Sequence, residues 1–253
     1  MALEAFSLTG KHVVIVGASS GIGKAAAIRC AEAGATVSLA ARRTELLSEI
    51  VAGLPGSRHG FHMLDVRDSG SVPACMDSFV KRAGPISGLV YSVGVSTLLP
   101  LNVAGEDHWQ GVLDVNLTGA VFCTKEAVSA RRCSPEGMGI VWISSSAAQN
   151  PAGAGRLSYG ASKAGMIGAA RALANELSRR TIRINVLCPA AVATDIWNTQ
   201  PMSDEQKKRF FDRHPLGIGA PDDIAYACVY LLSPAARWLT GTVISIDGGF
   251  SVT

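Results

Sequence analysis

A tyrosine and a lysine stand one helical turn apart in a stretch otherwise built from small residues, LSYGASKAG at 157–165. On a helix, the side chains of Tyr159 and Lys163 project from the same face. A phenol has a pKa of about 10, and a neighbouring ammonium group favours the phenolate and lowers that pKa. The pair therefore predicts a group that exchanges protons, while the surrounding Gly, Ala and Ser leave room for a flat ligand.

Composition and charge exclude several classes of protein. The 253 residues are 48% hydrophobic with a formal net charge of +3, and their basic residues form scattered pairs rather than a stripe. We therefore expect no nucleic-acid partner. The six cysteines lie far apart without metal-ligand spacing, which predicts reduced thiols and no metal site. Because the chain shows neither a signal peptide nor a membrane-length apolar run, we expect a cytoplasmic protein without a membrane partner.

Short apolar runs recur along the chain with helical patterns between them. Continuous apolarity, rather than alternation, is typical of strands covered on both faces in a parallel sheet. The runs occupy 12–17, 36–41, 60–66, 88–94, 139–145, 182–189 and 243–249. The pattern predicts one α/β domain over 1–253, a Rossmann-type, doubly wound, seven-stranded parallel sheet with helices on both faces.

The longest irregular stretch, 190–220, predicts a segment that covers a substrate pocket. Ser203 and Gln206 can form a capping box, so a short helix is expected to start there. The segment carries apolar side chains without an obvious place in the core, namely Trp197, Met202, Phe210 and Phe211. An oligomer contact or ordinary packing is the alternative interpretation.

A glycine-rich turn, GASSGIG, follows the first predicted strand and opens the first helix. Glycine lets the backbone bend tightly there, and bare N–H groups at a helix start bind a diphosphate. The turn therefore predicts a dinucleotide site made by Gly17, Ser19, Ser20, Gly21, Ile22 and Gly23.

The end of the second strand, LAARR, indicates which dinucleotide is bound. Ala41 stands where NAD sites usually keep a carboxylate for the ribose 2′-hydroxyl. Arg42 and Arg43 follow, and a guanidinium group can bind a 2′-phosphate with two hydrogen bonds. We therefore expect NADP(H) rather than NAD(H); the alternative is that Arg42 is a solvated residue at a helix start.

Taken together, these motifs resemble the short-chain dehydrogenase/reductase family over the whole chain. The matching pieces are GASSGIG, LDV (64–66), VNLTG (115–119), ISS (143–145), Tyr159-x-x-x-Lys163, IRINVLCP (182–189) and IDGG (246–249). The resemblance implies hydride transfer between a nicotinamide cofactor and a carbonyl or secondary alcohol. It also implies a catalytic tetrad of Asn116, Ser145, Tyr159 and Lys163.

Each member of the tetrad has an implied task. The serine hydroxyl stabilises charge on the substrate oxygen, and Tyr159 acts as general acid and base. The family has Lys163 hold the nicotinamide ribose, and has Asn116 steady a water that leads protons to the lysine. Counting from the apolar strand selects Ser145, with one residue inserted before the tyrosine, whereas the commoner family spacing selects Ser146.

The resemblance implies further cofactor contacts and shows two departures. Asp65 and Val66 match the pair that contacts adenine, although Asp65 could equally be a turn residue. The other implied contacts are Ser92, Gly94, Pro189, Val192 and Thr194. The usual Asn-Asn-Ala-Gly reads Tyr91-Ser92-Val93-Gly94 here, so its hydrogen bonds must be arranged differently. The usual Pro-Gly reads Pro189-Ala190, which removes a backbone freedom.

The covering segment resembles that of 3-oxoacyl-acyl-carrier-protein reductases, so a 3-oxoacyl thioester is the first substrate expected. An acyl carrier protein is then a possible partner, because Arg180 matches a carrier-contacting arginine. The other expected basic position falls near Glu136, and Arg179 with Arg180 could simply be a solvated helix end. The alternative substrates are a free ketone, sugar, steroid or other secondary alcohol.

Two further expectations concern assembly and activity. Family members form homodimers or homotetramers, here through helices at about 106–130 and 158–179 and the last strand. A non-catalytic, cofactor-sensing protein on the same fold would be expected to lack part of the tetrad, so an enzyme is favoured.

Overall fold

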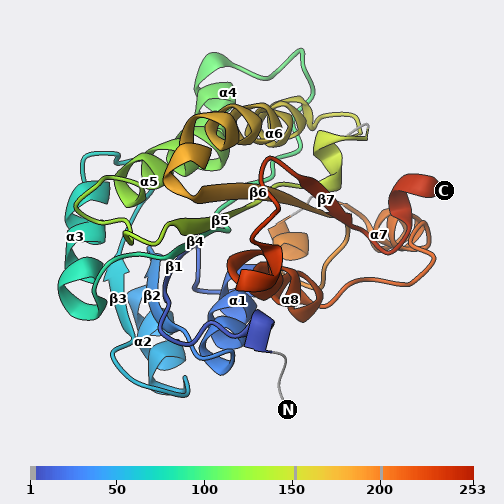
Figure 1. Ribbon diagram of the computed structural model, residues 1–253. Coiled ribbons are helices and arrows are strands. Elements are labelled where there is room, and N and C mark those ends of the chain that lie inside the picture. Colours follow the sequence, from blue (N-terminus) through green and yellow to red (C-terminus); the bar gives the residue numbers. More distant parts are fainter. Residues whose placement is uncertain (1–3, 151–152, 200–201) are drawn as a thin grey trace.

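The architecture comes from a computed structural model, which describes residues 4–150, 153–199 and 202–253. Its centre is a seven-stranded sheet in the order β3-β2-β1-β4-β5-β6-β7 (Figure 1), in which every pairing is parallel. The strands are β1 (His12–Val16), β2 (Thr36–Ala41), β3 (Gly60–Met63), β4 (Gly88–Tyr91), β5 (Met138–Ile143), β6 (Ile182–Pro189) and β7 (Val243–Ile246). The predicted fold class is confirmed, and each apolar run contains one strand or all but one residue of it.

Helices cover both faces of this sheet (Figure 1). One layer contains α1 (Gly21–Glu32), α2 (Thr44–Ala52) and α8 (Pro221–Leu232). The other contains α3 (Val72–Ala83), α5 (Gly119–Ala127) and α6 (Leu157–Leu177), with α4 (Glu106–Leu113) packed on α6. The short helix α7 (Asp204–Phe211) lies near the C-terminus, outside these two layers.

The hydrophobic core follows from the alternation of side chains along buried strands. Every residue of β1 is buried. Val14 and Val16 join the cluster beneath α3, α5 and α6, whereas Val13 and Ile15 join the cluster beneath α1 and α8. Successive side chains point to opposite faces, so a run of consecutive apolar residues supplies both halves of the core.

The order of the strands places a ligand crevice. β1 pairs with both β2 and β4. The chain therefore runs from β1 through β2 and β3 to one edge of the sheet, and then returns to the other side of β1 with β4. In doubly wound sheets, ligands bind beyond the carboxyl ends of the strands at such a switch point. The glycine turn after β1 and the segment after β4 both emerge there.

A π-helical turn interrupts the long helix that the sequence predicts at about 106–130. This turn, η2 (Asp114–Thr118), separates α4 from α5. The buried Tyr91 of β4 donates a hydrogen bond from its hydroxyl to the Val115 carbonyl in η2. At Gly119 an added Cβ would lie 2.5 Å from that hydroxyl, so only glycine leaves room for it. Tyr91 thus provides a link to η2 at the point where the sequence departs from the family's usual asparagines.

Replacing Tyr91 by phenylalanine should destabilise the protein, because it leaves the carbonyl of Val115 without this hydrogen bond at a buried position. We expect Tyr91→Phe to lower the free energy of unfolding by about 1–3 kcal/mol, measured by urea denaturation. The control Tyr226→Phe removes a hydroxyl from a side chain that is 57% exposed and should change stability by less than about 0.5 kcal/mol. Equal midpoints for Tyr91→Phe and wild type would contradict the role given to this bond.

Candidate active site

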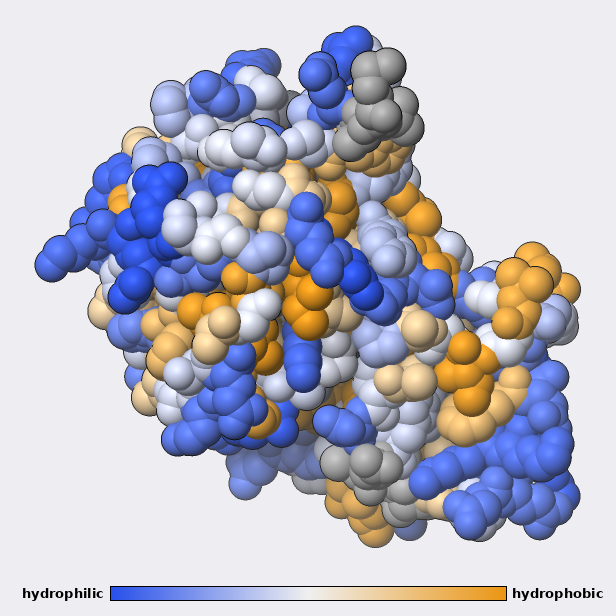
Figure 2. All heavy atoms as spheres, turned by 90° about the horizontal axis from the view of Figure 1, so that it is seen from below, coloured by the Kyte–Doolittle hydropathy of each residue, from blue (hydrophilic) through white to orange (hydrophobic). Residues whose placement is uncertain are grey.

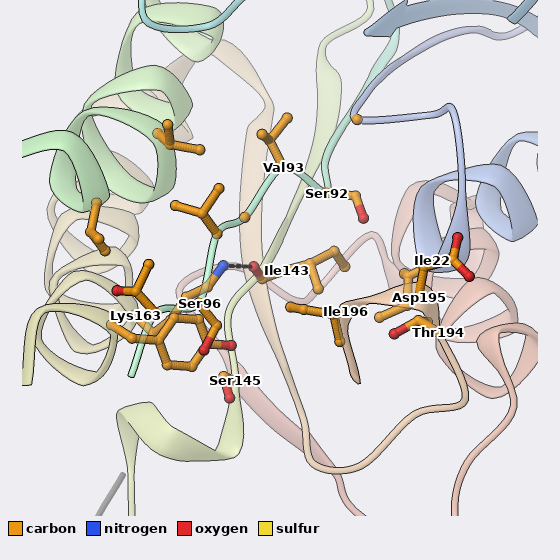
Figure 3. A pocket seen from close by; sticks show the side chains of 18 of the residues that line it. Ile22, Ser92, Val93, Ser96, Ile143, Ser145, Lys163, Thr194, Asp195 and Ile196 are labelled. Carbon is orange, nitrogen blue, oxygen red and sulfur yellow. Dashed lines mark hydrogen bonds between the residues drawn. The ribbon is translucent and has the colours of Figure 1, made fainter. Parts of the chain in front are cut away.

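A cavity of about 1020 Å³ opens at the carboxyl ends of the central strands. Figure 3 shows its two ends: Ile22, Thr194 and Asp195 lie together on one side, and Ser96, Ser145 and Lys163 lie together on the other. One end is therefore built by the start of α1 and the loop after β6. The other is built by the loops after β4 and β5 together with α6.

Most of the predicted site residues line this one cavity. They are Gly17, Ser19, Ser20, Gly21, Ile22, Arg42, Arg43, Asp65, Val66, Ser92, Gly94, Ser145, Tyr159, Lys163, Pro189, Val192 and Thr194. The two that do not are Gly23 and Asn116, which pack behind the wall. Parts of the chain far apart in sequence are thus brought to a single site.

The glycine turn has the close backbone contacts that its sequence predicts. A Cβ on Gly23 would lie 2.2 Å from the carbonyl oxygen of Gly17, and a Cβ on Gly17 would lie 2.8 Å from the backbone of Ser92. Gly17 and Gly21 also have positive φ angles, 88° and 53°. Side chains are therefore excluded where bare N–H groups open the helix α1, and the turn fits a dinucleotide diphosphate.

The two arginines after β2 have different neighbours. Arg43 donates hydrogen bonds from Nη2 to Ser19 Oγ at 2.9 Å and to Ser20 Oγ at 2.8 Å, so it braces the glycine turn. The positive charge of Arg42 acts on Asp65, but the main partner of Asp65 is Arg67, whose hydrogen bonds lower the pKa of that carboxyl to about 2. A contact of Asp65 with adenine would therefore have to share this carboxylate with Arg67.

Lys163 is the most deeply buried cation at the opposite end of the cavity, with 3% of its surface exposed. Its Nζ donates a hydrogen bond to the carbonyl oxygen of Ile143 at 2.9 Å, drawn as a dashed line in Figure 3. Burial lowers the pKa of the Lys163 ammonium group to about 8. The lysine is therefore poised to titrate much closer to neutrality than an exposed one.

The hydroxyl of Tyr159 is hydrogen-bonded with the side chain of Ser145. Burial raises the pKa of Tyr159, and the Ser145 hydrogen bond and the charge of Arg156 lower it by less. The prediction that Lys163 lowers this pKa is wrong when only the groups of the protein are considered. Burial raises the pKa of Tyr159 by more than the other groups lower it. Lys163 Nζ is hydrogen-bonded to Ile143 and lies 5.9 Å from the centroid of the Tyr159 ring. The phenol is therefore held in its protonated form at neutral pH.

The three consecutive serines after β5 point to different partners. Ser144 donates from Oγ to the carbonyl oxygen of Lys163 at 2.8 Å and so ties β5 to α6. Ser145 faces Tyr159 and also accepts a hydrogen bond from the Ala147 backbone at 3.1 Å. Ser146 is buried within a short 3₁₀ turn. Of the two serines considered from the sequence, Ser145 is the one that reaches the tyrosine hydroxyl.

Asn116 holds the wall of the cavity rather than opening into it. Its side chain accepts from Val95 N at 2.8 Å and donates to Val95 O at 3.0 Å and to Ser162 Oγ at 2.9 Å. Both amide protons are used in these bonds. The side chain therefore fixes the loop after β4 against α6, close to Lys163.

The segment after β6 supplies aromatic side chains to the cavity. Trp197 and Phe210 line it, and their ring centroids lie 5.4 Å apart. The predicted capping box is confirmed, since Ser203 Oγ accepts from Gln206 N and Gln206 Oε1 accepts from Ser203 N. Within the described chain, Ala190 is not among the residues with a positive φ, so the expected glycine is not needed there.

Comparison with known proteins identifies the family. A family model described as "Enoyl-(Acyl carrier protein) reductase" matches residues 17–251. The chain is 34% identical to the 3-oxoacyl-(acyl-carrier-protein) reductase FabG of Thermotoga maritima, over 97% of this chain and 99% of that protein. The chain belongs to the short-chain dehydrogenase/reductase family.

Other relatives within this short-chain dehydrogenase/reductase family have names that give different substrates. The chain is 37% identical to D-threitol dehydrogenase of Mycolicibacterium smegmatis, over 98% of this chain and 95% of that protein. A solved gluconate 5-dehydrogenase from Burkholderia cenocepacia J2315, in complex with NADP and tartrate, matches with a TM-score of 0.90 and 26% identity over 100% of both chains. Membership of this family shows that the protein is an oxidoreductase that binds a nicotinamide cofactor, but it does not identify the substrate.

Three further observations concern membrane spans, metal sites and the surface of this short-chain dehydrogenase/reductase. In the described ranges 4–150, 153–199 and 202–253, no helix is long and apolar enough to cross a membrane, and no cluster of His, Cys, Asp and Glu could hold a metal ion. On the face in Figure 2, hydrophobic side chains gather at several separate places among hydrophilic ones. They do not form one continuous apolar band there.

The burial of Lys163 predicts a pH dependence of stability. Below pH 8 the lysine is charged in both folded and unfolded states, so the folded protein bears the full cost of burying the charge. As pH rises from about 8 toward the ordinary pKa of 10.5, the unfolded state holds more protons and stability increases. Between pH 7 and pH 10 wild type should gain roughly 2.5 kcal/mol relative to Lys163→Met, measured by urea unfolding. If the free energy of unfolding changed with pH in the same way in both proteins, the lysine would not be desolvated.

Proposed function

We propose that this protein is an NADPH-dependent oxidoreductase that transfers hydride between nicotinamide and a carbonyl or secondary alcohol. The observation that carries the proposal is the meeting of Ser145, Tyr159 and Lys163 at one end of the cavity whose other end is the glycine turn. A cavity with a diphosphate-binding turn and an acid–base group at its two ends suits an extended dinucleotide.

The side chains of the site divide the proton chemistry between them. When bound, the nicotinamide supplies or accepts the hydride. Ser145 donates a hydrogen bond to the substrate oxygen and stabilises the charge that develops there. Tyr159 donates its proton to that oxygen during reduction and takes it back during oxidation. Lys163 holds the cofactor ribose, and Asn116 keeps the loop after β4 in place beside the lysine.

The preference for NADPH rests on the arginines after β2. Ala41 leaves this position without a carboxylate, and Arg42 lines the cavity beside it. Arg43 is bound to Ser19 and Ser20, so we assign the 2′-phosphate contact to Arg42 and the support of the turn to Arg43. The NADP in the gluconate 5-dehydrogenase structure is consistent with this assignment.

Two substrate classes follow from the relatives and from the cavity. A 3-oxoacyl thioester is the first, in line with the FabG relatives and with the apolar lining from Val95, Leu98 and Trp197. A free ketone, sugar or other secondary alcohol is the second, favoured by the D-threitol dehydrogenase relative and by polar lining groups such as Thr97 and His108. In both cases we propose that the segment after β6 covers the substrate through its described parts, 190–199 and 202–220; residues 200 and 201 lie outside the described residues.

Three further predictions concern partners and location. The prediction that an acyl carrier protein docks near Arg180 loses support, because Arg180 Nη2 already donates to the carbonyl oxygen of Val128 at 2.6 Å. Assembly into homodimers or homotetramers and a cytoplasmic location stay predictions of the sequence.

Tyr159→Phe tests the proposed acid–base chemistry. The variant should lose at least about 1000-fold in kcat with every ketone and with a 3-oxoacyl thioester, since it lacks the phenol proton that the proposed mechanism transfers to the substrate oxygen. NADPH binding, followed by fluorescence, should stay within about threefold of wild type. Retained turnover would refute the role of Tyr159. Bound NADPH without turnover by wild-type protein on any substrate would instead favour a cofactor sensor.

Cofactor preference has a separate test in the two arginines. Loss of a charge-assisted contact costs about 1.5–3 kcal/mol, so Arg42→Ala should weaken NADPH binding roughly 10- to 100-fold and NADH binding hardly at all. Arg43→Ala should weaken both cofactors to a similar extent, because it loosens the turn that both share. Equal losses of NADPH and NADH in Arg42→Ala would contradict the phosphate contact.

A further inference from the structure

A buried histidine behind the cavity makes contacts that the proposed hydride transfer does not use. His214 follows α7, which lies near the C-terminus in Figure 1, and 5% of its surface is exposed. Its ring stacks on the ring of Phe250 with centroids 4.8 Å apart. It also packs edge-on against Phe210 with centroids 5.3 Å apart. These two contacts hold the imidazole in one orientation.

Both ring nitrogens of His214 are hydrogen-bonded. Nε2 accepts a hydrogen bond from the backbone N–H of Ala191 at 3.1 Å. Nδ1 lies 3.1 Å from the carbonyl oxygens of Phe210 and Phe211, so it carries the ring proton and donates to them. A neutral imidazole therefore joins the end of α7 to the loop after β6.

The loop after β6, residues 190–194, connects the two ends of the cavity. β6 is the neighbour of β5, the strand that Ser145 follows, so the loop begins beside that serine. It then reaches the glycine turn, where a Cβ on Gly21 would lie 3.1 Å from Thr194 Cγ2. A cofactor bound as proposed, with its diphosphate on that turn and its nicotinamide beside Ser145, therefore has its nicotinamide half along this loop.

The bond to His214 holds this loop from behind the cavity wall. Ala191 is 3% exposed, so its N–H needs a partner within the protein. Its carbonyl oxygen accepts from the backbone N–H of Gly219 at 3.0 Å. The residues on either side, Ala190 and Val192, line the cavity. Removing the His214 acceptor would therefore disturb a buried N–H directly between two lining residues.

We propose that His214 is a positioning residue, whose bond to Ala191 holds the loop after β6 in the shape that receives the nicotinamide half of the cofactor. The imidazole acts through the loop and itself lies behind the cavity wall. The inference rests on the placement of the cofactor in the proposed function and adds a residue to it. Positioning requires the acceptor at Nε2, whereas packing alone requires only a ring against Phe250.

Two variants separate positioning from packing, with binding measured by isothermal titration calorimetry. His214→Phe keeps a ring against Phe250 but has no acceptor. His214→Gln loses the ring and keeps an amide oxygen that reaches about as far as Nε2. His214→Phe should weaken the binding of NADPH about tenfold or more, and that of 2′-phospho-ADP-ribose, which lacks the nicotinamide, by less than about threefold. His214→Gln should stay within about threefold of wild type for both ligands.

A second buried histidine provides a matched control. His59 is 9% exposed, and its Nδ1 accepts a hydrogen bond from the backbone N–H of Val37 at 3.0 Å. It stands directly before β3, at the opposite ends of the strands from the cavity. His59→Phe should leave both affinities within about threefold of wild type. A tenfold loss of NADPH binding in this control would show that destabilisation alone has the effect, and would overturn the role of His214.

The remaining outcomes separate this inference from the proposed function. Equal losses for NADPH and 2′-phospho-ADP-ribose would overturn the role of His214 and leave hydride transfer intact. The same holds if His214→Phe binds NADPH like wild type, or if His214→Gln loses as much affinity as His214→Phe. A selective loss of NADPH binding in His214→Phe, without turnover of any substrate by wild type, would support positioning and overturn hydride transfer instead. If His214→Phe does not fold, His214→Asn replaces it with the same expected loss, because its amide is too short to reach Ala191.

Discussion

The hydrogen bond from Lys163 to the carbonyl oxygen of Ile143 is the interaction around which the site is arranged. It joins a helix to the end of a central strand, and it holds an ammonium group in a place where only 3% of the side chain is exposed. Burying a charge is unfavourable unless polar partners surround it. The lowered pKa of Lys163 reports that cost, so the surrounding structure must hold the lysine firmly in order to keep it there.

Several bonds share this task. Ser144 binds the backbone of Lys163 from the strand side, and Asn116 joins the loop after β4 to Ser162, one residue earlier on the same helix. The π turn that carries Asn116 is linked to the sheet by Tyr91. π turns often occur at functional sites, where they interrupt the regular α-helix and change the direction of a side chain. Here the turn lets one asparagine bind both backbone groups of Val95.

Local patterns in the sequence were sufficient for the fold and for most of the cavity lining. The run IRINVLCP coincides with β6, and TVSLAA coincides with β2, because buried parallel strands need continuous apolarity. The glycines of the turn were identifiable because a side chain at Gly23 would collide with backbone. Counting from the apolar strand selected Ser145, and Ser145 is the serine whose side chain reaches Tyr159; its catalytic role stays a prediction.

What the sequence could not give depends on contacts between distant segments. Nothing local shows that Tyr91 reaches Val115 or that Arg43 binds the glycine turn. The direction of the Tyr159 pKa was missed for the same reason: spacing reveals a neighbouring cation, but burial is a property of the packed molecule and has the larger effect.

A crystal structure of the full chain with NADP⁺ tests the central claim most directly. The account predicts the diphosphate on the turn from Gly17 to Gly23, the 2′-phosphate at Arg42, and the nicotinamide ring beside Ser145, Tyr159 and Lys163. A nucleotide bound outside this cavity, or one whose nicotinamide lies away from those three side chains, would contradict the assignment of the site and the hydride chemistry built on it.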